Sequence, residues 1–141
     1  MSWIQNLSFR EKTAWVSLLT TVGVYTWYFA PLLTGAPPSG AGRLAFAIAA
    51  LAALQTVPLI VLAALDPADA KTPADERETL FVLKGCRVAY GVLLAGALAC
   101  CVGSLHFGLN GIWLGNGLLA AIVAGEIAKS AAQLLYYRRG A

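Results

Sequence analysis

The sequence predicts an all-α integral membrane protein, in which four transmembrane helices pack as one antiparallel bundle. Of its 141 residues, 59% are hydrophobic and only 12% are charged, about half the charged fraction of a typical soluble domain. Three stretches lack Asp, Glu, Lys and Arg altogether: residues 13–42, 44–65 and 88–125, with lengths of 30, 22 and 38 residues. Because about 20 apolar residues cross a bilayer core, the first two stretches hold one span each. The third would form a helix of about 57 Å, so it must turn within the glycine-containing segment 103–111 and hold two spans. The length of the chain allows a single domain, 1–141.

The first helix is expected at about residues 8–33. Ser8 and Glu11 have the spacing of a capping box, in which the serine side chain accepts a hydrogen bond from the third helical N–H. Trp15 near one end and several aromatic residues near the other are typical of the two membrane interfaces. The apolar region is much longer than that of a signal peptide, which indicates a retained span.

The second helix is expected at about residues 41–65, after a loop rich in proline and glycine. Pro58 should kink it. The polar neighbours Gln55 and Thr56 can either satisfy the carbonyls that the proline frees or line a pathway, and we favour the structural role.

Residues 66–87 form the largest charged segment, with five of the seven acidic residues and four of the ten basic ones. We expect a loop followed by the start of the third helix, at about 73–103. Thr72 would be its N-cap and Pro73 its first helical residue.

The third helix and the fourth, at about 110–139, each carry a row of small residues, which permits close helix packing. The expected rows are Gly91, Ala95, Ala99 and Gly103 in the third helix and Gly117, Ala121 and Gly125 in the fourth. Such rows can also join two copies of a chain, but they are common by chance in spans rich in alanine and glycine. They are therefore weak evidence for a homodimer, which stays open as an alternative.

Lys and Arg accumulate in the N-terminal lead, in segment 66–87 and at the C-terminus, whereas the two other connections contain only Arg43. Cytoplasmic loops carry such an excess. Both termini and the charged segment are therefore expected in the cytoplasm.

Glu126 is the first candidate functional residue, because an ionisable side chain within a span is costly. Lys129 lies three residues away and can pair with it. Lys84 and Arg87 of the third helix should lie at the same level. We prefer the structural alternative, in which these four charges form an interfacial cluster that fixes the third helix against the fourth.

The second candidate is the run Asp75, Glu76, Arg77 and Glu78, a contact surface for a cytoplasmic protein partner. Acidic residues also suit the first turn of a helix. Stabilising the first turn does not explain why acidic residues are in excess in a segment expected on the cytoplasmic side, where Lys and Arg accumulate.

No cofactor, metal site or catalytic residue is expected. The three cysteines and the single histidine have no metal or redox spacing, and no nucleotide loop or hydrolase triad is present. The basic residues do not cluster with exposed aromatic residues, so no nucleic acid is expected. A non-enzymatic role is favoured, and a lipid-modifying enzyme ranks last because no nucleophile stands out.

Four short segments, spread over the chain, carry a resemblance: 8–15, 75–78, 126–129 and 137–140. With them the chain resembles a family of small, uncharacterised bacterial inner-membrane proteins with four helices. The resemblance implies location in the bacterial inner membrane. Relatives are often encoded near small helix-turn-helix regulators, which favours a regulatory partner. The expected function is that of a sensor, regulator or scaffold, and the alternative is a homodimeric transporter of an ion or small solute that uses Glu126.

Overall fold

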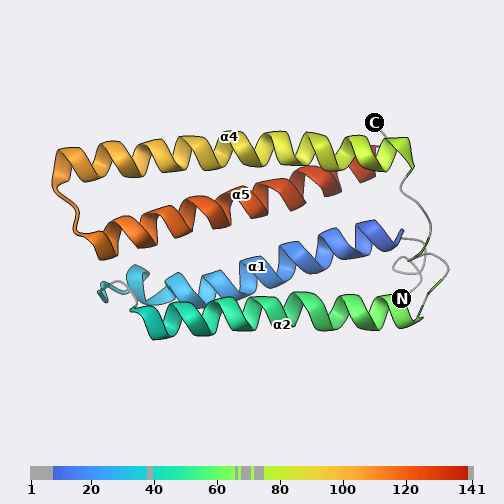
Figure 1. Ribbon diagram of the computed structural model, residues 1–141, viewed down its shortest axis with the longest axis horizontal. Helices are drawn as coiled ribbons and strands as arrows, with labels where there is room; N and C mark the ends of the chain where they lie inside the picture. Colours follow the sequence, from blue (N-terminus) through green and yellow to red (C-terminus); the bar gives the residue numbers. More distant parts are fainter. Residues whose placement is uncertain (1–7, 38–39, 66, 68–70, 72–74, 140–141) are drawn as a thin grey trace.

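The structure is a computed structural model that describes residues 8–37, 40–65, 67, 71 and 75–139. Its long helices are α1 (Phe9–Leu33), α2 (Ala41–Leu65), α4 (Glu76–Phe107) and α5 (Gly111–Arg139). Each of these four is long and apolar enough to cross a membrane, which confirms the expected multi-pass, all-α architecture. α1 and α4 begin at the same end of the bundle at which α2 and α5 finish (Figure 1). We call it the charged end.

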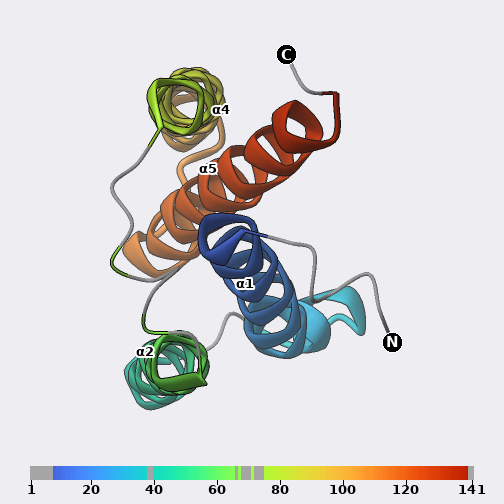
Figure 2. The same ribbon diagram turned by 90° about the vertical axis from the view of Figure 1, so that its right-hand side faces the viewer.

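The helices pack in the order α2, α1, α5, α4, and the pairing of α4 with α5 is the most extensive (Figure 2). α1 and α5 occupy the two central positions and contribute most of the buried side chains. The outer helices expose many large apolar side chains. This exposure suits a membrane protein, because lipid tails are as apolar as the side chains that they cover.

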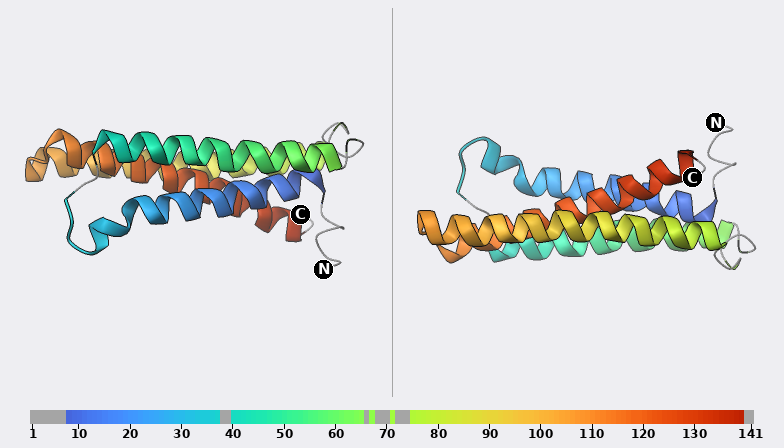
Figure 3. Two further views of the ribbon diagram at one scale, coloured as in Figure 1. Left: turned by 90° about the horizontal axis from the view of Figure 1, so that it is seen from below. Right: turned by 90° about the horizontal axis from the view of Figure 1, so that it is seen from above.

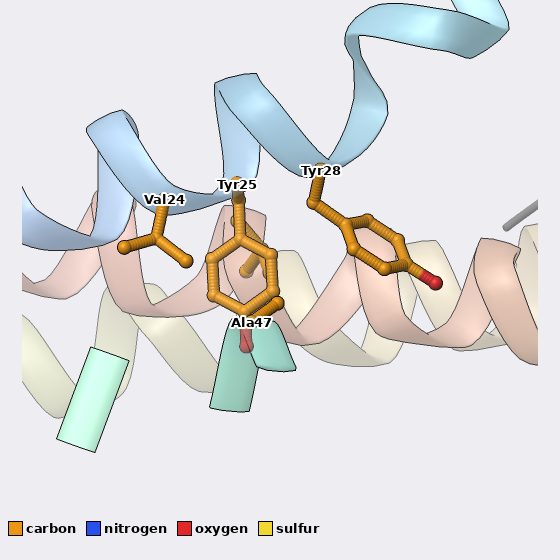
Figure 4. Packing of buried hydrophobic residues seen from close by; sticks show 5 residues of the cluster. Val24, Tyr25, Tyr28 and Ala47 are labelled. Atoms are coloured by element: carbon orange, nitrogen blue, oxygen red, sulfur yellow. The ribbon is translucent and has the colours of Figure 1, made fainter. Parts of the chain in front are cut away.

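α1 and α5 cross at an angle near the middle of the molecule (Figure 3). Val24, Tyr25 and Tyr28 of α1 pack with Ala47 of α2 and Val123 of α5 (Figure 4).

Small residues let α4 and α5 approach closely, as expected for the α5 row. A Cβ atom added at Gly117 would lie 2.9 Å from the sulfur of Cys100, and one added at Gly96 would lie 2.6 Å from the Cβ of Ala121. At Gly125 the nearest atom would be the carbonyl oxygen of Ala89, at 3.4 Å. The backbones of the two helices thus meet at positions where a larger side chain has no room.

The row predicted on α4 was wrong. Gly91, Ala95 and Ala99 are exposed, and a Cβ at Gly91 would meet nothing within 4 Å. These three residues lie on a side of α4 that does not pack against α5. The contact face of α4 passes instead through Gly85 and Gly96.

The ends of the helices follow the capping chemistry in two cases. The Ser8 side chain accepts a hydrogen bond from Glu11 N–H at 3.3 Å, as predicted. α4 begins at Glu76, and its N-cap is Asp75, whose carboxylate accepts from Glu76 N–H at 2.7 Å. The expected cap at Thr72 lies outside the described residues. α4 also continues to Phe107, four residues beyond the predicted end at 103.

Two hydrogen bonds tie α2 to α1. The Trp27 carbonyl has no helical partner four residues on, because Pro31 has no N–H. Arg43 donates to that carbonyl at 2.6 Å and lies 4.4 Å from the Trp27 ring centroid. Gln55 donates to the Thr21 hydroxyl at 3.3 Å, so its role is to join two helices rather than to satisfy carbonyls freed within α2.

Candidate functional site

A cleft of about 410 Å³ lies between α1 and α5 at the charged end. We call it the polar cleft. Its lining residues are Phe9, Arg10, Thr13, Ala14 and Ser17 of α1, Val82 of α4, and Lys129, Ser130, Gln133 and Tyr137 of α5.

The α5 wall follows from the spacing of the sequence. Glu126, Ser130, Gln133 and Tyr137 recur every three or four residues, and this spacing places them on one side of a helix. Ser130 and Gln133 are buried. A polar row therefore runs along α5 from the charged end; it is buried at Ser130 and Gln133 and exposed at Glu126, which is farthest from that end.

Hydrogen bonds inside the polar cleft are few. The Ser130 hydroxyl donates to the Ser17 hydroxyl at 3.5 Å, a long bond that joins α5 to α1. The Thr13 hydroxyl bonds to the carbonyl of Phe9 within α1 at 2.8 Å. The Tyr137 hydroxyl is buried and makes no hydrogen bond to the described residues. Buried polar atoms are usually satisfied, so this wall has unused hydrogen-bonding capacity.

The outer rim of the polar cleft is held by an ion pair. Arg10 Nε lies 3.1 Å from Glu78 Oε2, which joins the first turn of α1 to that of α4. Both side chains are partly exposed, at 40% and 21%, so the pair contributes at most about 1 kcal/mol. Nearby, the guanidinium of Arg138 lies 5.4 Å from the Trp15 ring centroid.

The inner end of the polar cleft carries a second ion pair. Lys129 Nζ lies 2.7 Å from Glu126 Oε2 on the same helix, with side-chain exposures of 31% and 48%. Lys84 lies over the Tyr136 ring, 5.0 Å from its centroid, and Arg87 is exposed. Within the described part of the chain, the four predicted charges thus divide into separate contacts, and their functional role stays a prediction.

The four residues of the predicted partner surface also divide. Asp75 caps α4, and Glu78 pairs with Arg10. Glu76 and Arg77 are exposed. The first two therefore have structural roles, and the other two are available at the surface.

Sequence reasoning did not identify the polar cleft. It singled out Glu126 and Lys129 but overlooked Ser130 and Gln133. The signal was present in the three- and four-residue steps that follow Glu126 along α5.

The chain matches no family model, no curated protein and no solved structure with which it was compared. The resemblance to a bacterial inner-membrane family thus remains a prediction. Its confirmed part is the set of four long apolar helices, each able to span a bilayer.

Proposed function

We propose that the protein is a membrane-embedded regulator or scaffold that contacts a soluble protein partner at its charged end. The observation that carries the proposal is the exposure of Glu76 and Arg77 on the first turn of α4. α4 has 32 residues, about 48 Å of helix, which exceeds a bilayer core of roughly 30 Å. Its first turns therefore extend into the aqueous layer, where a soluble partner can reach them. The excess of Lys and Arg at this end supports a cytoplasmic orientation, and the sequence resemblance supports a bacterial inner membrane.

The proposal is tested by photo-crosslinking in intact membranes from a reactive residue placed at Leu80, which is exposed about one turn after Glu76 and Arg77. We expect a defined protein adduct that disappears in the double variant Glu76→Gln, Arg77→Gln. Arg139→Gln is the control, because Arg139 is an exposed cation at the same end but on α5. An adduct pattern unchanged by the double variant would contradict the proposal.

A second candidate is a homodimeric transporter in which Glu126 couples to an ion or small solute. The position of the Glu126–Lys129 pair at the inner end of the polar cleft favours it. A second cavity, of about 320 Å³, lies toward the opposite end and is lined in part by Tyr28 and Asn116. The packed residues at the crossing of α1 and α5 lie between the two spaces. Transport would thus require the crossing to open or a second subunit to complete the path.

Flux measurements in proteoliposomes test this second candidate. Glu126→Gln should abolish coupled uptake, whereas Glu76→Gln, outside the polar cleft, should not. Uptake that survives Glu126→Gln would remove the coupling role of this residue.

A further inference from the structure

The Glu126–Lys129 ion pair faces the outside of a membrane helix. Glu126 lies about 18 Å from Arg138 along α5, and nearly half of its side chain is exposed. Gly85 of α4 approaches Lys129, and Ala89 approaches Gly125, so the pair is level with the part of α4 where charged residues give way to apolar ones. Lipid headgroups lie at this level, and a polar headgroup can contact the exposed pair.

The polar cleft provides a place for such a headgroup beside the pair. Lys129 belongs both to the ion pair and to the lining of the cleft. Arg10 supplies a second cation from the α1 wall, and the hydroxyls of Ser17 and Ser130 lie between the two walls. Phe9 and Val82 add apolar surface. A lining with both charged and apolar parts suits an amphipathic ligand.

The charges of the site indicate which amphipathic ligand fits. The two charged residues of the lining are each already paired with one carboxylate, Arg10 with Glu78 and Lys129 with Glu126. A ligand with net charge would leave the site unbalanced in a region of low dielectric constant. A zwitterion keeps the balance, because its anionic part can approach the cations while its cationic part approaches a carboxylate. Serine hydroxyls can also accept hydrogen bonds from a primary ammonium. A quaternary ammonium has no N–H group and cannot donate such a bond.

We propose that the polar cleft binds the phosphoethanolamine headgroup of a membrane phospholipid. The phosphate contacts Lys129, and the ammonium contacts the Glu126 carboxylate and the hydroxyl of Ser17 or Ser130. The volume of about 410 Å³ lies within the usual range for a small-ligand site. The proposal is independent of the partner surface on α4.

Native mass spectrometry of the purified full chain tests the proposal. The protein is mixed with equal amounts of phosphatidylethanolamine, phosphatidylglycerol and phosphatidylcholine of identical acyl chains. We expect preferential retention of phosphatidylethanolamine, reduced about tenfold by Lys129→Gln, since a charge-assisted hydrogen bond is lost. Lys84→Gln is the matched control, because this lysine lies over Tyr136 outside the polar cleft, and it should retain the wild-type preference.

Two further variants separate headgroup recognition from damage to the fold. Lys129→Arg keeps the cation and should restore most of the retention. Glu126→Gln leaves the site with a net positive charge and should shift the preference toward phosphatidylglycerol. Equal retention of the three lipids by the wild type, or equal loss of retention in Lys129→Gln and Lys84→Gln, would overturn the proposal. Binding of soluble O-phosphoethanolamine without lipid retention would overturn the assignment to a lipid.

Discussion

Replacement of Gly96 by alanine tests how α4 packs on α5. The added Cβ would lie 2.6 Å from Ala121 Cβ and 3.3 Å from Ala121 Cα, whereas unbonded carbons prefer about 3.5–4 Å. The helices would have to separate by about 1 Å along their most extensive contact. Overpacking of this kind costs about 1–3 kcal/mol, and the better helix propensity of alanine returns up to about 1 kcal/mol. We expect a net loss of about 1–2 kcal/mol in the free energy of unfolding.

The same helix offers a matched control for this change. Gly91→Ala adds an identical methyl group at a position with nothing within 4 Å, so only the gain in propensity should remain. Unfolding by denaturing detergent, followed by circular dichroism, gives both values. The double variant Gly96→Ala, Ala121→Gly should recover part of the loss, because it restores space at the contact. A larger destabilisation from Gly91→Ala than from Gly96→Ala would refute the assignment of the contact face.

Three further predictions use the same unfolding assay. Arg43→Ala removes both the charge-assisted hydrogen bond to the Trp27 carbonyl and the cation–π contact with the Trp27 ring, and it should lower the free energy of unfolding by about 2 kcal/mol. Arg43→Lys keeps the positive charge and should retain part of this stability. Tyr28→Phe removes the bond of 3.0 Å to Asn116 Oδ1 and should cost about 0.5–1.5 kcal/mol; the absence of any cost would show that this buried bond adds no stability. A double-mutant cycle on Arg10 and Glu78 should give a coupling energy of at most about 1 kcal/mol that falls as salt is raised, and a coupling insensitive to salt would contradict the exposed position of this pair.

The number of spans could be predicted from the sequence because charge is expensive inside a bilayer. The uncharged stretches 13–42, 44–65 and 88–125 therefore locate the four helices. The order in which the helices pack could not be predicted in the same way. In water, an apolar stripe identifies the buried side of a helix, but in lipid the exposed side is equally apolar. α2 and α4 have almost no buried residues, so their sequences carry little information about their neighbours.

The polar cleft was harder to predict than the ion pair beside it. The Glu126–Lys129 pair depends only on a spacing of three residues within one helix. The approach of Ser17 to Ser130 joins residues 113 positions apart and depends on the angle at which α1 crosses α5. That angle depends on packing between helices, such as the cluster that joins Tyr25 and Tyr28 to Val123, and no local pattern encodes it.

The polar side chains of α1 show which polar groups the fold itself requires. Thr21 accepts a hydrogen bond from Gln55 of α2, and Tyr28 donates one to Asn116 of α5. Both bonds join α1 to a neighbouring helix, and such bonds stabilise helix association in a membrane. The Tyr137 hydroxyl has no comparable partner among the described residues, and Lys129 pairs only within its own helix. Ser130 bonds to Ser17 of α1, and Gln133 packs against Gly85 of α4, so helix packing accounts for these two members of the wall. The polarity that packing leaves unexplained is that of Tyr137 and Lys129, and the headgroup that we propose for the polar cleft would use it.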